Sequence, residues 1–243
     1  MIKTDRRTVL RAAAALVAAT ACTPTRAVGH PATPEPSSPR RIPGRPTHLT
    51  HGPGDTHRVA LTFHGNGDPG TAEAILDAAD EHGARITVLA VGTWLDANPA
   101  LARRILDAGH DLGNHTQHHL DINAMPEAQA RAEITACARR LKRLSGTIGP
   151  WFRPSRAARA SPLVARLAKD TGYPHVLSYD VDPLDFTGPG PTALADTLTA
   201  DIRPGSIVSL HFGYPDTVAA LPAVLEDLHR RGLTAVTTTE LFS

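Results

Sequence analysis

The sequence has few aromatic residues and no excess of charge of either sign. Aromatics make up 4% of the 243 residues, and 25 basic side chains balance 24 acidic ones to leave a net charge of +1. A nucleic-acid-binding domain is expected to show clustered Lys and Arg with interleaved aromatics, whereas the charges here are intermixed. The composition therefore argues against a nucleic-acid partner, and we expect a monomer whose charged runs are solvated helix faces.

Cysteine is nearly absent, and the longest apolar run is short. The two cysteines are Cys22 and Cys137, and Cys137 falls inside a helical pattern without a partner, so no structural disulfide is predicted. The alanine-rich run from Ala12 to Ala21 is shorter than the ~20 apolar residues that a membrane-spanning helix needs. Because Arg6 and Arg7 precede it, residues 1–22 are interpreted as a cleaved signal of the twin-arginine type.

The end of this signal leaves two alternatives for the location of the exported protein. Ala19-Thr-Ala-Cys22 is similar to a lipobox, in which the cysteine is acylated and becomes the mature N-terminus. We then expect a lipoprotein at the outer face of the cytoplasmic membrane, which contacts the membrane only through a lipid anchor at Cys22. Cleavage near Ala27 would instead release a free secreted protein.

Beyond the signal, the chain divides into a polar segment and one folded domain. Residues 23–58 are rich in Pro, Ser, Thr and Gly with almost no apolar residue to bury, which predicts a disordered tether. Residues 59–243 alternate short apolar runs with longer segments of helical periodicity, which predicts an α/β domain with a parallel sheet or barrel. The expected strands are 59–63, 86–91, 111–113, 151–153, 176–179, 207–210 and 235–237. The expected helices are 71–82, 98–108, 126–144, 161–171, 191–201 and 216–231.

The stretch LTFHGNGDPG from Leu61 to Gly70 has the G-x-G-x-x-G spacing of a dinucleotide-binding turn. Such a site needs an acidic residue about 20 positions further on, near the end of the next strand. That strand end is Leu89-Ala-Val-Gly-Thr93 and carries no carboxylate. A nucleotide-dependent oxidoreductase is therefore disfavoured.

Polar residues follow the ends of the predicted strands, where parallel α/β folds place their chemistry. His115 and His119 are four apart, so on one helical turn both rings would point to one side and could share a metal; capping or solvated histidines are the alternative. His211 ends an apolar run and is either a core residue or a general acid or base. Asp182 and Asp185 could orient His211 or merely form a turn. Arg153 could align an acidic group or lie on the surface.

Taken in chain order, these segments resemble one family. The stretches GHDLGNHTQHH, WFRPSR, LSYDVDPLDF and GSIVSLHF, after a strand that ends in Thr62-Phe63, are similar to the motifs of the polysaccharide deacetylases. This group is also called the NodB-homology group, or carbohydrate esterase family 4. The resemblance covers residues 59–242. It implies a single distorted (β/α) barrel of about seven strands and metal-dependent removal of acetyl groups from a sugar polymer.

The resemblance also implies roles for individual residues. His115 and His119 match the two metal-binding histidines, and His211 matches the general acid that protonates the leaving amine. Asp185 matches the carboxylate that tunes this acid, and Arg153 matches the arginine that tethers the catalytic base. The implied cofactor is a divalent metal, with zinc favoured. Such a metal lowers the pKa of bound water toward ~7 and stabilises the oxyanion of the tetrahedral intermediate.

This chain departs from the family pattern at the first motif, T-F-D-D-G-P. His64 stands where the family has its catalytic base, and Gly65 stands where it has the third metal ligand. Two substitutions of role would compensate for this departure. In the first, His64 ligates the metal and Asp68 or bulk water is the base. In the second, His64 is the base and two histidines hold the metal more weakly. The remaining alternative is that metal and activity are both lost.

Three smaller departures concern the substrate groove. The family usually has P-Y-G where this chain has Ser155-Arg-Ala157, a tryptophan where it has Phe186, and a leucine where it has Ser209. Two functions follow as hypotheses. The first is an exported deacetylase of peptidoglycan or chitin-like glycans. The second is a catalytically impaired lipoprotein that keeps the same fold as a glycan-binding surface.

Overall fold

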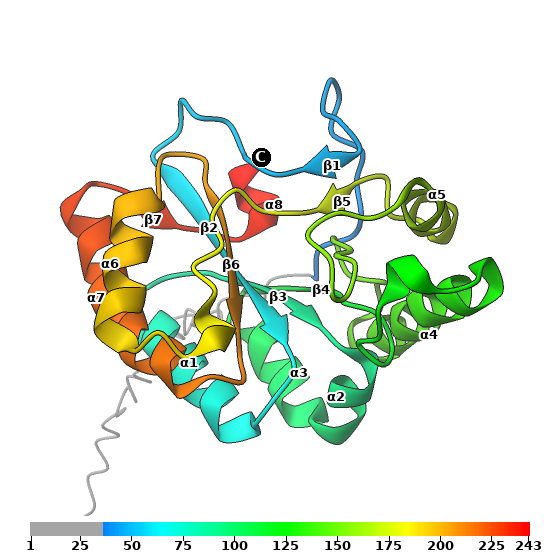
Figure 1. Ribbon diagram of the computed structural model, residues 1–243, viewed down its shortest axis with the longest axis horizontal. Helices are drawn as coiled ribbons and strands as arrows, with labels where there is room; N and C mark the ends of the chain where they lie inside the picture. The colour runs from blue at the N-terminus through cyan, green and yellow to red at the C-terminus, as the bar shows by residue number, and fades with distance from the viewer. Residues whose placement is uncertain (1–35) are drawn as a thin grey trace, which may run out of the picture. The chain divides into compact units, whose positions relative to one another are not determined.

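The computed structural model describes residues 36–243, which form an α/β unit with helices around a parallel sheet (Figure 1). The signal of residues 1–22, Cys22 and the first part of the expected tether lie outside the described residues. The strands are β1 (His48–Leu49), β2 (Arg58–Gly65), β3 (Thr87–Ala90), β4 (Asp111–Asn114), β5 (Val176–Leu177), β6 (Ile207–His211) and β7 (Thr234–Ala235). The helices are α1 (Pro69–Glu81), α2 (Gly92–Ala97), α3 (Pro99–Asp107), α4 (Glu127–Ser145), α5 (Pro162–Thr171), α6 (Pro191–Asp201), α7 (Pro215–Arg230) and α8 (Thr238–Leu241).

All strand pairs are parallel, and β2 lies at the centre of the sheet. The order is β4-β3-β2-β6, β7 also pairs with β2, and β1 pairs with β5. Isolated bridges continue this order from Asn114 to Phe152, from Phe152 to Val176, and from Val181 to Val208 in β6. The chain thus follows the path of a distorted barrel whose ladder is interrupted between β4 and β6.

Both faces of the central strand are buried, as expected for a parallel sheet covered by helices. Val59, Leu61 and Phe63 of β2 are 0% exposed and pack in the main core cluster with residues of α1 and α7. Prolines at the first position start α1, α3, α5, α6 and α7, where the absent N–H has no helical partner to lose. The α/β prediction is confirmed.

Three local predictions were wrong. The expected strand 151–153 makes only isolated bridges at Phe152, because Pro150 and Pro154 flank it and neither can donate a ladder hydrogen bond. The short helices α2 and α8 were not expected, since each is too brief to show a period. Thr237, expected in the last strand, instead caps α8 in a capping box with Glu240.

The folded domain also begins earlier than residue 59, which corrects the expected tether of residues 23–58. His48 and Leu49 form β1, and Leu49 is only 1% exposed. The Ile42 N–H donates to His175 Nε2 at 2.9 Å, and the Gly52 N–H donates to the Gly205 carbonyl at 2.8 Å. This segment is ordered although it has few apolar residues, because its backbone forms hydrogen bonds with β5 and with neighbouring loops.

Candidate active site

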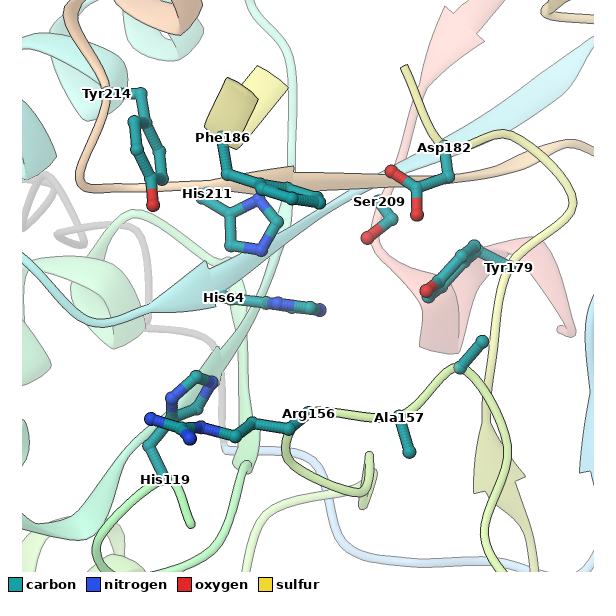
Figure 2. A pocket seen from close by; sticks show the side chains of 11 residues that line it. His64, His119, Arg156, Ala157, Tyr179, Asp182, Phe186, Ser209, His211 and Tyr214 are labelled. Carbon is teal, nitrogen blue, oxygen red and sulfur yellow. The ribbon is translucent and has the colours of Figure 1, made fainter. Parts of the chain in front are cut away.

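A pocket of about 350 Å³ lies where β2 and β6 end. Figure 2 shows His64, His119 and His211 converging on it from three different segments of the chain. His64 and His211 are paired in register on β2 and β6, so their side chains leave the sheet side by side. The ring centroids of His64 and His211 are 4.3 Å apart, and those of His64 and His115 are 4.4 Å apart. The parallel register thus gathers residues that are distant in sequence.

His211 is held by a buried carboxylate. Its Nδ1–H donates to Asp185 Oδ1 at 2.7 Å, and its backbone N–H donates to Asp185 Oδ2 at 2.9 Å. The hydroxyl of Thr217 on α7 also donates to Oδ2, at 2.7 Å. Because Asp185 is 0% exposed and accepts these three bonds, it fixes the His211 ring with Nδ1 protonated. The Nε2 atom remains available toward the pocket, and Thr217 is a supporting residue that the sequence motifs did not indicate.

His64 and His115 each place a buried nitrogen without a partner in the site. Among the described residues, neither His64 Nε2 nor His115 Nε2 has a hydrogen-bond partner. His115 Nδ1 contacts the Arg153 carbonyl at 3.1 Å, and since a carbonyl only accepts, Nδ1 carries the proton and Nε2 the lone pair. Burial, followed by the neighbouring histidine and arginine charges, holds the pKa of both rings well below 6.5, so both are neutral near pH 7.

The segment that carries the two spaced histidines is a loop, so they do not come together through the helical turn that their spacing would allow. Thr116 and His119 have φ values of 70° and 56°, in the left-handed region that non-glycine residues rarely adopt. Asn114 Oδ1 accepts from the Thr116 N–H at 2.9 Å, and Glu133 on α4 accepts from the N–H groups that follow. Even so, the ring centroids of His115 and His119 are 5.0 Å apart. The loop brings them together by side-chain caps rather than by helical periodicity.

Arg153 is buried and does not pair with a carboxylate. It is 0% exposed, and its guanidinium donates to Thr62 Oγ1 at 2.8 Å and to the carbonyls of Leu177 and Ser178. No ion pair joins Arg153 to an acidic group of the described chain, and its Nη1 has no partner there. Burial lowers the pKa of Arg153 to about 10, so it stays a cation behind the pocket. It adjoins His64, whose pKa its charge helps to lower.

The residues suit a metal in donor chemistry but do not yet form a complete ligand set. Neutral imidazoles with buried lone pairs, as at His64 and His115, are what a zinc ion prefers. Within residues 36–243, however, no group of three His, Cys, Asp or Glu side chains is placed so that it could hold a metal ion. His119, half-buried with its pKa lowered chiefly by burial and then by the charge of Arg156, is the third histidine nearby. The fit therefore rests on the orphaned nitrogens.

The glycine turn serves packing rather than phosphate binding. A Cβ on Gly65 would lie 2.8 Å from Val88 Cγ1, so this position closes directly against β3. Asp68, considered as a base, instead caps α1 by accepting from the Thr71 N–H at 3.1 Å, and it does not line the pocket. A carboxylate already occupies the helix N-terminus that a phosphate would need.

The opposite wall of the pocket was not predicted as one site, although Asp182 and Ser209 were noted separately. It contains Tyr179, which the sequence pattern treated as a strand end, together with Asp182 and Ser209. Tyr214, after β6, and Arg156, noted only as a departure from the family pattern, also line the pocket. The stretch LSYDVD contained the signal, because its alternating polar positions follow a buried strand.

Comparisons with known proteins agree with this fold. The family model described as polysaccharide deacetylase matches residues 51–176. A peptidoglycan-N-acetylglucosamine deacetylase of Bacillus cereus is 30% identical over 199 residues, covering 78% of this chain and 90% of the relative. A chitooligosaccharide deacetylase of Bradyrhizobium sp. is 30% identical over 200 residues, covering 73% and 87% respectively. The chain belongs to the polysaccharide deacetylase family.

Solved structures match the same fold. A mutant with restored enzymatic activity of a Bacillus anthracis pseudoenzyme from carbohydrate esterase family 4 is 25% identical. Its TM-score is 0.77, and the match covers 82% of this chain and 72% of that one. Structural relatives of this chain thus include a pseudoenzyme.

Proposed function

We propose that the protein is an exported, metal-dependent hydrolase that removes acetyl groups from amino-sugar polymers such as peptidoglycan or chitin-like glycans. The observation that carries the proposal is the His211–Asp185 contact of 2.7 Å at the edge of a pocket that also contains His64. The named activities of the relatives support the substrate class. The paired arginines and apolar run of residues 1–22 support export.

In this proposal, side chains on two sides of the substrate's N-acetyl amide have different roles. His211 gives a proton from Nε2 to the leaving amine, and Asp185 keeps its ring oriented and stabilises the protonated form. His115, His119 and His64 are the residues that would hold a divalent metal, with zinc favoured. The metal would activate water and polarise the acetyl carbonyl. Arg153, a buried cation with no ion pair among the described residues, favours negative charge that develops near His64.

His64 has two possible roles, and we favour that of a ligand. Its Nε2 is buried without a partner, as is the Nε2 of His115, and the two rings lie 4.4 Å apart. Without His64 the metal would have two protein ligands, fewer than the three of ordinary catalytic zinc sites. If His64 is a ligand, the base is either Asp68 or solvent water. Because Asp68 caps α1, solvent water is the remaining candidate. The competing role is that His64 takes the proton itself.

The test is acetate release from N-acetylglucosamine oligomers and from peptidoglycan, with Zn²⁺ or Co²⁺ added. We expect release that falls about 100-fold or more in His211→Ala, because general acid catalysis contributes ~10² to 10⁴ in rate. His229→Ala, an exposed-helix histidine at the end of α7, is the matched control and should keep the full rate. Equal release by His211→Ala and the parent on every substrate would refute the proposal.

A second candidate function has its own support. Neither an ion pair between Arg153 and a carboxylate nor a complete metal site is present among the described residues, which favours a glycan-binding protein without catalysis. This alternative predicts saturable glycan binding that His115→Ala and His119→Ala leave unchanged. Loss of binding in both variants would count against it.

A further inference from the structure

One polar side chain of the pocket has no task in the hydrolysis proposed above. Ser209 is 1% exposed, and its Oγ has no hydrogen-bond partner within 3.5 Å in the described chain, although the Tyr179 hydroxyl lies close enough to influence it. Because it lies two residues before His211 on β6, both side chains leave the same face of the strand. Figure 2 shows the Ser209 hydroxyl directed into the pocket, between His211 and Tyr179. A buried hydroxyl without a partner marks a position where a polar atom of a ligand is expected.

The neighbours of Ser209 make this wall suitable for a hydroxyl group. Tyr179 stays a protonated phenol because burial, and then the Asp182 charge, raise its pKa. Asp182 lines the same wall, and its Oδ1 accepts one hydrogen bond, from the Leu184 N–H at 3.2 Å. The wall of Ser209, Tyr179 and Asp182 therefore offers both donors and acceptors. Tyr179 also lies near enough to Asp182 and Ser209 to interact with both. A methyl group there would leave Ser209 Oγ without a close partner, whereas a hydroxyl can satisfy a donor and an acceptor together.

The depth of Ser209 indicates which part of a glycan could reach it. β6 ends at His211, whose side chain is 19% exposed at the mouth, and Ser209 lies about 7 Å further in at 3.3 Å per residue. A sugar polymer is too wide to follow the strand inward. With its amide nitrogen at His211, only the short acyl substituent of the sugar extends toward Ser209.

We propose that Ser209, with Tyr179 and Asp182, binds a hydroxyl group on the acyl substituent, so that the pocket prefers N-glycolyl (2-hydroxyacetyl) amino sugars over N-acetyl ones. This specificity rests on the proposed function, because it uses the same pocket and the same orientation of the amide. The resemblance to the family, which expects leucine at position 209, agrees with a wall that has changed from apolar to polar.

The experiment measures equilibrium binding by calorimetry, so that it does not depend on turnover. Glucosamine trimers that are fully N-glycolylated or fully N-acetylated are titrated into the purified chain, into Ser209→Ala and into Ser209→Leu. We expect the parent to bind the glycolyl trimer about three- to tenfold more tightly, the range for one net hydrogen bond. Ser209→Ala should bring the ratio close to one, and Ser209→Leu should invert it.

Controls separate this proposal from the proposed function. Ser206→Ala, a serine outside the pocket just before β6, should keep the parent ratio, and thermal unfolding checks that each variant folds. A preference without hydrolysis would sustain the binding inference while refuting catalysis. A parent ratio of one, or no binding of either trimer, overturns the inference. Equal weakening of both trimers by Ser209→Ala also overturns it, since Ser209 would then contact a ring hydroxyl.

Discussion

The two sides of the pocket differ in whether their buried polar atoms have hydrogen-bond partners. On the acid side, the Asp185 carboxylate accepts three hydrogen bonds, and the ring of His211 is fixed by them. On the opposite side, His64 Nε2 and His115 Nε2 are buried without partners among the described residues. Buried polar atoms are normally paired, so the unpaired side is the one that waits for a ligand. In the proposed function, the paired side is the general acid and the unpaired side is where a metal would be held.

The largest effect is expected from Asp185→Asn, which disrupts the hydrogen bonds that orient His211. The amide can present a donor to His211 Nδ1, which then needs the opposite tautomer, and we expect acetate release to fall about 100-fold or more. The lost acceptors should also lower the free energy of unfolding by about 1–3 kcal/mol. Steady-state kinetics and urea unfolding measure the two effects. Asp170→Asn, on an exposed stretch of α5, is the control; a fully active Asp185→Asn protein would contradict the pairing.

A smaller effect is expected from filling the glycine position on the histidine side. Gly65→Ala would bring its methyl group 2.8 Å from Val88 Cγ1, so overpacking should lower the free energy of unfolding by about 1–3 kcal/mol. Val88→Ala should relieve part of this cost, since Ala90 Cα at 3.0 Å stays in place, and a double-mutant cycle in urea would detect the relief. Gly54→Ala, whose nearest neighbouring atom is 3.8 Å away, should be neutral. Equal stability of Gly54→Ala and Gly65→Ala would show that position 65 has room for a side chain.

The smallest effect is expected from Glu133→Gln, which loosens the loop that carries His119. Glu133 accepts from the Gln117 and His118 N–H groups and contacts His118 Nδ1 at 2.6 Å. The glutamine amide keeps one acceptor oxygen, so the expected loss in free energy of unfolding is about 1 kcal/mol. Chemical unfolding with Glu127→Gln, an exposed glutamate on the same helix, provides the comparison. A change no larger than that of Glu127→Gln would remove Glu133 from the account.

The sequence predicted the elements with strong periodicity and the residues at strand ends. Strands β2 and β6 were predicted because their apolar runs are long, and His64 and His211 followed as neighbours at the ends of parallel strands. The shape of the loop of His115 was not predicted, since it depends on side-chain caps from Asn114 and Glu133 that no local pattern reveals. The polar wall at Ser209 could not be predicted either, because an unpaired hydroxyl is a property of packing.

The most direct test of this account is metal analysis of the purified protein and of His64→Ala, with dialysis against limiting zinc. If His64 is a ligand, the parent should hold close to one equivalent of zinc and His64→Ala should bind it about 10-fold or more weakly. Gln117→Ala is the control, because it alters the loop that carries His115 and His119 without removing a histidine. Undiminished zinc binding in His64→Ala with loss of hydrolysis would contradict the ligand role and make His64 the base.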